Sequence, residues 1–345
     1  MRTADFDYNL PKKLIAQTPQ EPRDHSRLLV LSRAQGTLEH RRFFELGDYL
    51  KPGDLLVCND SRVLPARLFG HWEDSGGKVE VFLLRQMETE LWEVLLKRGR
   101  RGKPGAGIVL GSHRAEVTAR ASDGSFILRF PEGPPLDLGV IPLPPYIHSP
   151  LDDPERYQTV YARPQGSVAA PTAGLHFTPS LMASLREKGV RFAFVTLHVG
   201  WGSFRPVRAE DPSQHTLHQE YGEIGEEAAR EIGRARAEGR RIITVGTTAT
   251  RLLEEAALAQ GLSGEGTRPS AEGLRPYRAW TSLYILPGHP FRLVDALITN
   301  FHLPRSTLLM LVSAFAGREL ILGAYAEAAR LGYRFYSFGD GMLIL

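Results

Sequence analysis

Residues 168–207 read VAAPTAGLHFTPSLMASLREKGVRFAFVTLHVGWGSFRPV and contain three successive signals for local structure. A loop of small residues ends in the imidazole of His176. A helix over 179–188 is predicted next, because Thr178 is a favourable N-cap residue and a proline follows it. The third signal is a strand over 190–199, whose apolar and β-branched residues indicate burial. A loop, a helix and a buried strand in this order are typical of α/β folds, which bind ligands at the ends of strands.

Two histidines stand at these ends, His176 after the loop and His198 in the strand's last residues. A single histidine beside apolar residues is more often a core residue with a satisfied hydrogen bond than a catalytic group. The small residues before His176 favour a ligand site, because glycine and alanine let the backbone approach a flat molecule closely. The alternative is a tight turn packed against a neighbouring strand.

The composition indicates a globular protein large enough for two domains. The chain has 345 residues, of which 42% are hydrophobic and 23% charged. Its formal net charge is only +3, yet its pI is about 9.0 and it holds 35 arginines against 7 lysines. This arginine excess fits either compositional bias or a phosphate-rich partner, and charge balance does not decide between them.

Several classes of protein are disfavoured. Cys58 is the single cysteine, so no intramolecular disulfide is expected, and a lone thiol in an apolar run fits the reducing cytosol. The segment MRTADFDYNL lacks the hydrophobic region of a signal peptide, and no apolar run has the length of a membrane span. No cysteines and histidines have metal-ligand spacing, so we expect a cytoplasmic protein without a metal.

Other predicted strands also end in polar residues. A strand over 55–58 runs into Asn59 and Asp60, which form either the edge of a site or an Asx-type turn. A strand over 241–246 leads to Thr247 and Thr248, which open a helix predicted over 251–259. Free backbone N–H groups and hydroxyls at a helix N-terminus suit an anion.

The C-terminal third continues this pattern. A strand over 280–286 is predicted, and another over 293–299 that ends in Asn300 and His302. A helix over 306–316 is apolar on nearly every side and therefore belongs in the interior. Near the N-terminus we predict a helix over 10–17, followed by RDHSR at 23–27, which is either a solvated turn or an anion-binding edge.

The middle of the chain has a different sequence pattern. Short strands alternate with glycine-rich and charged turns about every ten residues, which indicates an antiparallel barrel or a small sandwich. We predict a main α/β domain with a mixed sheet over 1–67 and 148–345, with an antiparallel β-barrel domain inserted at 68–147. The barrel domain includes KRGRRGK at 97–103, which is either a solvated hairpin loop or a nucleic-acid backbone contact.

Several motifs together resemble one family over almost the whole chain. They are PTAGLHF, TLHVGWGSFRPV, VGTT, PGHPFRLVDALITNFHLPRSTLLMLVSAFAG and YRFYSFGDGMLIL, with DFDYNLPKKLIAQTP and PGDLLVCNDSRVLPARL in the N-terminal part. The chain resembles the bacterial S-adenosylmethionine:tRNA ribosyltransferase-isomerases of the queuosine pathway. The resemblance implies an α/β domain with an inserted barrel, which agrees with the independent prediction from the strand pattern.

The resemblance also implies a reaction. The ribosyl part of S-adenosylmethionine is transferred to 7-aminomethyl-7-deazaguanine at the tRNA wobble position and isomerised to an epoxycyclopentane. Adenine and methionine leave, and the product is epoxyqueuosine in tRNA. S-adenosylmethionine would be consumed as a ribosyl donor, with no further cofactor. No stripe of residues that suits a partner helix stands out in the sequence, so a monomer is expected.

Such a site needs a base for a proton beside the sulfonium and an acid for the departing adenine, roles that suit histidine. From residue chemistry we expect three catalytic candidates: His176, His198 and His302. We expect nine residues to bind substrate: Asn59, Asp60, Thr172, Gly174, Phe177, Gly200, Thr247, Thr248 and Asn300. We expect eight basic residues to contact tRNA: Arg62, Arg67, Lys97, Arg98, Arg100, Arg101, Lys103 and Arg205.

Two other functions remain open on the sequence. An RNA-binding module without chemistry would explain the pI and the basic run, but it leaves the two histidine-bearing loops unexplained. A base-exchange transglycosylase would need a carboxylate nucleophile, for which Asp340 is the one candidate, although a Gly-Asp-Gly turn favours a structural role.

Overall fold

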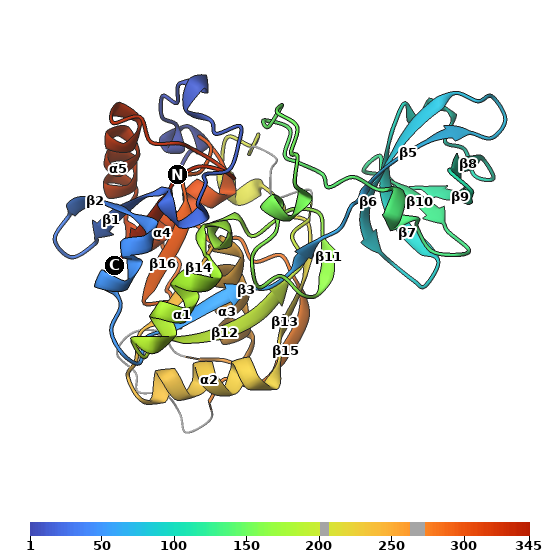
Figure 1. The fold of residues 1–345 in the computed structure, drawn as a ribbon. Helices are drawn as coiled ribbons and strands as arrows, with labels where there is room; N and C mark the ends of the chain where they lie inside the picture. The colour runs from blue at the N-terminus through green and yellow to red at the C-terminus, as the bar shows by residue number, and fades with distance from the viewer. Residues whose placement is uncertain (201–206, 263–272) are drawn as a thin grey trace. The chain divides into compact units, whose positions relative to one another are not determined.

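A computed structural model describes residues 1–200, 207–262 and 273–345 (Figure 1). The chain divides into two compact units. Unit 1 comprises Met1–Ser61, Pro145–Pro164 and Pro171–Leu345, and unit 2 comprises Arg62–Pro144 and Gln165–Ala170. Unit 1 holds a mixed sheet with helices and unit 2 holds a closed barrel, which confirms the predicted fold class.

Unit 1 is built on a nine-stranded sheet. β12, β3, β14 and β16 run parallel to one another in its centre, whereas β17 is antiparallel to β16 and parallel to β1. In sheet order the strands are β15 (Tyr277–Thr281), β13 (Glu220–Ile224), β12 (Arg191–Leu197), β3 (Leu55–Asn59), β14 (Ile242–Val245), β16 (Ala296–Asn300), β17 (Gly341–Ile344), β1 (Arg27–Ser32) and β2 (Thr37–Arg42). β3, β14 and β16 are buried along their whole length, as expected for strands covered on both faces.

The helices of unit 1 bury apolar faces against this sheet. Thr178 caps α1, since its hydroxyl accepts the Leu181 N–H at 3.1 Å, as the sequence predicted. The α-helices are α1 (Pro179–Glu187), α2 (Glu226–Ala237), α3 (Thr247–Ala259), α4 (Thr307–Ala316) and α5 (Arg318–Arg330). The 3-10 helices described in the two units are Thr3–Phe6, Lys12–Leu14, Arg23–His25, Phe43–Tyr49, Gly99–Arg101, Leu136–Leu138, Pro154–Tyr157, Thr172–His176 and Pro212–Gln214.

Unit 2 is a six-stranded barrel in which every neighbouring pair is antiparallel. Its strands are β5 (Arg67–Trp72), β6 (Lys78–Gln86), β7 (Leu91–Lys97), β8 (Gly107–Leu110), β9 (His113–Arg120) and β10 (Phe126–Arg129). A two-stranded parallel sheet of β4 (Arg62–Val63) and β11 (Gln165–Ser167) also belongs to this unit. Alternate residues of β6 are buried, which is the pattern of a barrel wall with one face inward.

Several local predictions need correction. The helix predicted over 10–17 is only the 3-10 turn Lys12–Leu14, because the Ala16 N–H donates to the Phe335 carbonyl at 3.1 Å instead of continuing a helix. The helix predicted over 251–259 begins at Thr247. Gly246, with φ at +94°, turns the chain sharply and its carbonyl accepts the Thr250 N–H, so the threonines form the first helical turn.

The predicted strand over 280–286 lies earlier, at Tyr277–Thr281, because register with β13 pairs Trp280 with Tyr221 and ends the ladder at Thr281. Within the described parts of the chain, no single helix has both the length and the apolar character to cross a membrane. α4 and α5 pass that test only as a pair, bent by 115°.

Candidate active site

Four parallel strands of unit 1 end at one edge of the sheet, and most of the predicted catalytic and substrate-binding residues follow them. Asn59 ends β3, His198 follows β12, Thr247 follows β14 and Asn300 ends β16 (Figure 1). Because these strands run parallel, their carboxyl ends share this edge, which is where α/β sheets bind ligands. The 3-10 helix Thr172–His176 packs against β16.

His176 lies in a hydrogen-bonded chain that crosses three segments. Its Nδ1 is 2.8 Å from the Ser26 hydroxyl and its Nε2 is 3.3 Å from the Asn300 amide nitrogen. That same nitrogen donates to the Tyr336 carbonyl at 3.0 Å. An amide nitrogen only donates, so this amide orientation requires Nε2 to accept and Nδ1 to carry the proton that Ser26 receives.

The surroundings of His176 hold its ring neutral. The ring is stacked on Phe43 with centroids 4.7 Å apart, and the residue is 5% exposed. Burial, with the nearby cations of Arg334 and Arg23, lowers its pKa from 6.5 to about 3. At neutral pH His176 is therefore uncharged. It forms hydrogen bonds but does not act as a general acid.

A small pocket opens beside His176. Its volume of about 20 Å³ has room for one water-sized group, and S-adenosylmethionine does not fit in it as it stands. It is lined by Pro19, Gln20, Arg23, Arg156, Leu175, His176, Ser337, Phe338 and Gly339.

His198 has a different set of partners. Its Nδ1 lies 2.7 Å from the Ser61 hydroxyl, and its ring is stacked on Tyr221 with centroids 6.0 Å apart. Burial lowers its pKa, while the carboxylate of Glu223 acts in the opposite direction. His198 is therefore less strongly biased toward its neutral form than His176.

Asn59 fixes the geometry of this second histidine. Its carbonyl oxygen accepts the N–H groups of Leu197 and Ser61, and its amide nitrogen donates to the Leu197 carbonyl and, at 3.2 Å, to the Thr248 hydroxyl. One buried amide thus ties together the ends of β3 and β12 and the start of α3. Asp60 accepts the Thr196 hydroxyl at 2.8 Å, and burial raises the pKa of its carboxyl group.

Gly200 is held by a buried ion pair. Its N–H donates to Glu220 at 2.8 Å, and the same carboxylate is 2.5 Å from the guanidinium of Arg251. Glu220 and Arg251 are 3% and 5% exposed. Glu220 begins β13, and no local signal pairs it with a helix residue that follows it by 31 positions.

His302 is separate from the other two histidines in its polar contacts. Its Nε2 lies 2.8 Å from the Thr299 hydroxyl, its backbone N–H donates to Tyr325 and its carbonyl accepts the Tyr8 hydroxyl. Burial lowers its pKa to about 3. At neutral pH its ring is therefore uncharged, and a catalytic role for His302 stays a prediction.

The remaining predicted substrate residues vary in their exposure. Phe177 is fully buried in the core, where its ring meets the edge of Phe43 at 5.2 Å. Gly174 is also buried, with Tyr161 packed directly against it. Thr247 is 6% exposed, and Thr172 is half-buried at the start of the loop that carries His176.

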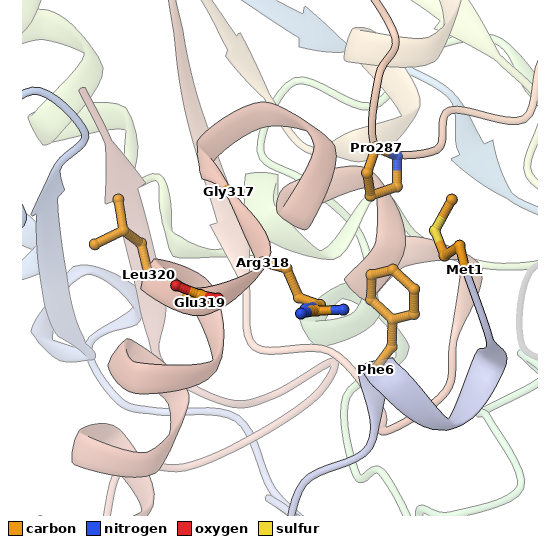
Figure 2. Close-up of a pocket in the computed structure, with 7 residues that line it drawn as sticks. All are labelled: Met1, Phe6, Pro287, Gly317, Arg318, Glu319 and Leu320. Carbon is orange, nitrogen blue, oxygen red and sulfur yellow. The ribbon is translucent and has the colours of Figure 1, made fainter.

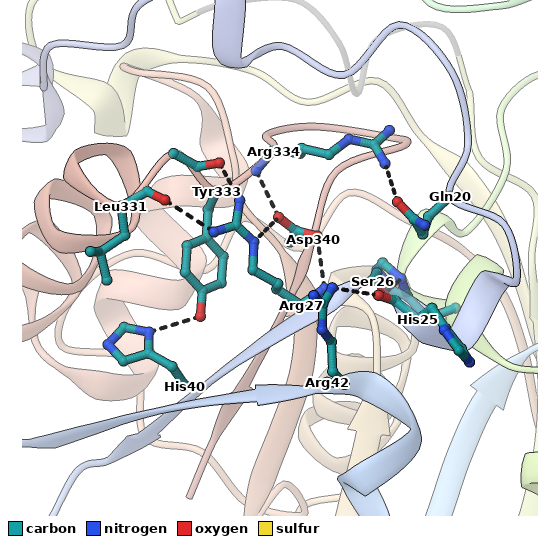
Figure 3. Close-up of polar contacts among 12 residues, drawn as sticks. Gln20, His25, Ser26, Arg27, His40, Arg42, Leu331, Tyr333, Arg334 and Asp340 are labelled. Atoms are coloured by element: carbon teal, nitrogen blue, oxygen red, sulfur yellow. Dashed lines mark hydrogen bonds and ion pairs between the residues drawn. The ribbon is translucent and has the colours of Figure 1, made fainter.

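Figure 3 shows the carboxylate of Asp340, which joins two segments of unit 1. Asp340 accepts the backbone N–H groups of Arg27 at 2.8 Å and of Arg334 at 2.7 Å, and the Arg27 guanidinium lies 3.4 Å away. Asp340 is 2% exposed. Both oxygens are therefore engaged in holding the C-terminal turn to the RDHSR segment, which favours the structural interpretation of Asp340.

The sequence analysis did not single out Ser26 as a site residue. It is 1% exposed and bonded to His176. Its one sequence signal was its place inside RDHSR, which had been interpreted as either a turn or an anion-binding edge.

Most of the predicted tRNA-binding residues lie in unit 2. Arg67 and Lys97 flank the carboxylate of Glu80 at 3.2 and 3.6 Å. Arg98, Arg100 and Lys103 are at least partly exposed, and Arg62 is half-buried in β4. The side chain of Arg101 and the whole of Arg205 lie outside the described residues.

A larger hollow of about 470 Å³ lies elsewhere in unit 1 (Figure 2). It is lined by Met1, Phe6, Pro287, Gly317, Arg318, Glu319 and Leu320, none of which is a predicted site residue. Among the residues that the structure describes, no group of three histidine, cysteine, aspartate or glutamate side chains has the geometry to hold a metal ion.

The chain is similar over its whole length to proteins of one family. The family model described as queuosine biosynthesis protein matches residues 3–344. Proteins named S-adenosylmethionine:tRNA ribosyltransferase-isomerase from Dehalococcoides mccartyi and Moorella thermoacetica are 54% and 53% identical, each alignment covering both chains completely. A crystal structure of S-adenosylmethionine tRNA ribosyltransferase from Thermotoga maritima is 40% identical, covers 99% of this chain and 100% of its own, and has a TM-score of 0.56.

Proposed function

This chain belongs to the queuosine biosynthesis protein family and is a ribosyltransferase-isomerase of that pathway, and from this premise we propose its substrates and product. It transfers the ribosyl moiety of S-adenosylmethionine to 7-aminomethyl-7-deazaguanine at the tRNA wobble position. The ribosyl group is isomerised, giving epoxyqueuosine in tRNA, and adenine and methionine are released. S-adenosylmethionine is consumed as a substrate, and no further cofactor takes part.

The first chemical step needs a base. Protons on the carbon beside a sulfonium are acidified, and their removal starts ring opening and the loss of adenine. A general base works best when its pKa lies near the operating pH. His198 fits this role better than His176, because Glu223 offsets part of the effect of burial on its pKa, whereas Arg23 and Arg334 add to the effect of burial at His176.

His176 serves as a neutral hydrogen-bonding group. Ser26 and Asn300 fix its tautomer and its ring plane. The positive charges of Arg23 and Arg334 also disfavour a further cation nearby, so an acceptor amine bound beside His176 would lose its proton more readily. The acceptor amine must be neutral to attack the ribosyl carbon, which gives the arginines around this site a chemical role.

The departing adenine needs a proton. Among the residues predicted from the sequence, Asp60 is the carboxylic acid whose pKa is raised, by burial, so it is our candidate for the donor. Thr247 and Thr248 at the start of α3 are proposed to hold the methionine carboxylate. Asn59 supports this assignment, since it orients the Thr248 hydroxyl.

The RNA is proposed to contact the basic residues of unit 2. Arg98, Arg100 and Lys103 lie on the loop that follows β7, where they can meet phosphate groups. We propose that the protein acts as a monomer in the cytoplasm, where its tRNA substrate is found.

The observation that carries this proposal is the placement of His198, Ser61 and Asp60 together at the carboxyl edge of the sheet. The test uses tRNA carrying 7-aminomethyl-7-deazaguanine, incubated with the protein and S-adenosylmethionine and then digested for mass spectrometry. We expect epoxyqueuosine, with adenine and methionine released in equal amounts. Wild-type turnover by both His176→Ala and His198→Ala would eliminate the catalytic assignment.

A further inference from the structure

The outer face of the barrel in unit 2 carries an exposed aromatic side chain. Side chains alternate between the two faces of a strand, and in β5 Leu68 and Trp72 are buried. Arg67, Phe69 and His71 therefore point outward. Phe69 is 58% exposed in the middle of a regular strand, where no turn or chain end accounts for its exposure.

The neighbouring strands extend this face. Phe69 lies opposite Glu80 of β6, and Glu80 lies opposite Lys97 of β7. Further along the same pair of strands, Arg67 lies opposite Phe82. These side chains share one face, because residues directly opposite each other in a sheet point the same way.

A further apolar residue continues the patch beyond the edge of β5. Val140 and Arg67 exchange both backbone hydrogen bonds, at 2.9 and 3.1 Å, so Val140 is the direct neighbour of Arg67. Val140 is 52% exposed. Single exposed apolar residues are ordinary, but Phe82 and Val140 flank Arg67 on the face that also carries Phe69, and apolar residues gathered on one face mark interaction surfaces.

The charge on this face selects the partner. Arg67, Lys78 and Lys97 are cationic, and the carboxylate of Glu80 lies between Arg67 and Lys97. Lys97 is also the first residue of the basic run that ends at Lys103. Aromatic rings among cations are the combination that binds single-stranded nucleic acid, since bases stack on the rings while phosphates meet the cations.

We propose that the face formed by Arg67, Phe69, Lys78, Phe82 and Lys97 is a stacking platform for an unpaired base of the RNA substrate. The inference rests on the proposed function, because it takes the RNA to be the tRNA that is modified. It adds a contact that a run of basic residues does not supply. Phosphate contacts depend only on the charge of the RNA backbone. Stacking on Phe69 requires an unpaired base that is not stacked on its neighbours.

The test compares tRNA binding by Phe69→Ala with the wild type at several salt concentrations. We expect Phe69→Ala to weaken binding by about tenfold or more. The dependence of log Kd on log salt concentration should be unchanged, because no phosphate contact is lost. Phe69→Tyr should bind like the wild type, since it keeps the ring. The matched control is Met87→Ala, which removes a similarly exposed apolar side chain beside Glu88 and Glu90 and should bind normally.

A second measurement places a reporter at the site. Phe69→Trp should bind tRNA with wild-type affinity, and its fluorescence should be quenched on titration, beyond the change seen in the wild type. Binding by Phe69→Ala within about twofold of the wild type, or an equal loss in Met87→Ala, would overturn the proposal. Sedimentation provides a further contradicting result: a wild-type dimer that Phe69→Ala loses while its RNA binding is unchanged. This face would then join two copies of the chain.

These readouts separate the inference from the proposed function. If the wild type modifies tRNA but Phe69→Trp shows no additional quenching, stacking is wrong and the reaction stands. If the wild type forms no product although Phe69→Trp is quenched, the face binds RNA and the proposed reaction is wrong.

Discussion

The loop that carries His176 depends on the absence of one side chain. A Cβ atom at residue 174 would lie 2.2 Å from the Tyr161 hydroxyl oxygen and 2.8 Å from Thr159 Cγ2. Both distances are well inside van der Waals contact, and Tyr161 is buried in the core of unit 1, so the ring has little room to retreat. We expect Gly174→Ala to lower the free energy of unfolding by about 3 kcal/mol, the upper range for overpacking.

The same substitution should affect turnover more than stability alone requires. Relief of the contact moves the 3-10 helix Thr172–His176, and a displacement of about 1 Å at a reacting group can cost on the order of a hundredfold in rate. Urea unfolding gives the stability and steady-state product formation gives the rate. Both are measured at a temperature where the variant remains folded.

Two further variants separate this contact from a general effect of alanine. Gly323→Ala lies on α5 with nothing within 4 Å of the added Cβ, and should stabilise the protein by about 1 kcal/mol. Tyr161→Phe removes the oxygen nearest to the new methyl group and should recover part of the loss when combined with Gly174→Ala. Unchanged stability in Gly174→Ala, or no recovery in the double variant, would refute the packing described for this loop.

Three further outcomes follow from buried groups. The pKa of His302 is lowered to about 3, so this histidine is protonated in the unfolded chain before it is protonated in the folded one. As the pH falls below about 6.5, the free energy of unfolding should therefore drop by about 1.4 kcal/mol per pH unit. Urea unfolding at a series of acid pH values should show that His302→Gln loses this part of the pH dependence. Glu220→Gln leaves Arg251 buried without its countercharge and should cost about 3–5 kcal/mol in thermal or urea unfolding, whereas Glu220→Gln combined with Arg251→Met should cost less. Asp340→Asn should lower the free energy of unfolding by about 2–3 kcal/mol, because one side of the amide carries an NH2 group and does not accept the second backbone N–H. Since Asp340 is structural on this account, the wild type should also form no covalent RNA adduct on a denaturing gel.

Much of the fold could be predicted from the sequence because its helices and strands are specified by neighbouring residues. Thr178 and the proline after it start α1, and the buried strands of unit 1 are short apolar runs, so the α/β class followed from pattern. Short strands such as Lys78–Gln86, separated by glycine-rich and charged turns, predicted the barrel. The positions of His198 and Asn300 at strand ends followed in turn, since parallel strands share one carboxyl edge.

The remaining features depend on partners distant in the sequence. The Ala16 N–H bonds to the Phe335 carbonyl and stops a helix that the local sequence favours. Ser26 contacts His176, which lies 150 residues away in the sequence, and no feature of the sequence near Ser26 predicts this contact. The backbone N–H of His302 donates to Tyr325, which lies 23 residues further along the chain.

The central claim is that S-adenosylmethionine gives its ribosyl group, and not its methyl group, to RNA. The most direct measurement uses two samples of S-adenosylmethionine, one labelled with ¹³C throughout the ribose and one labelled in the methyl group, each incubated with the protein and tRNA carrying 7-aminomethyl-7-deazaguanine. We predict that the ribose label enters the modified nucleoside while the methyl label leaves in methionine. Methyl label in the RNA, or ribose label absent from it while adenine is released, would contradict the proposed reaction.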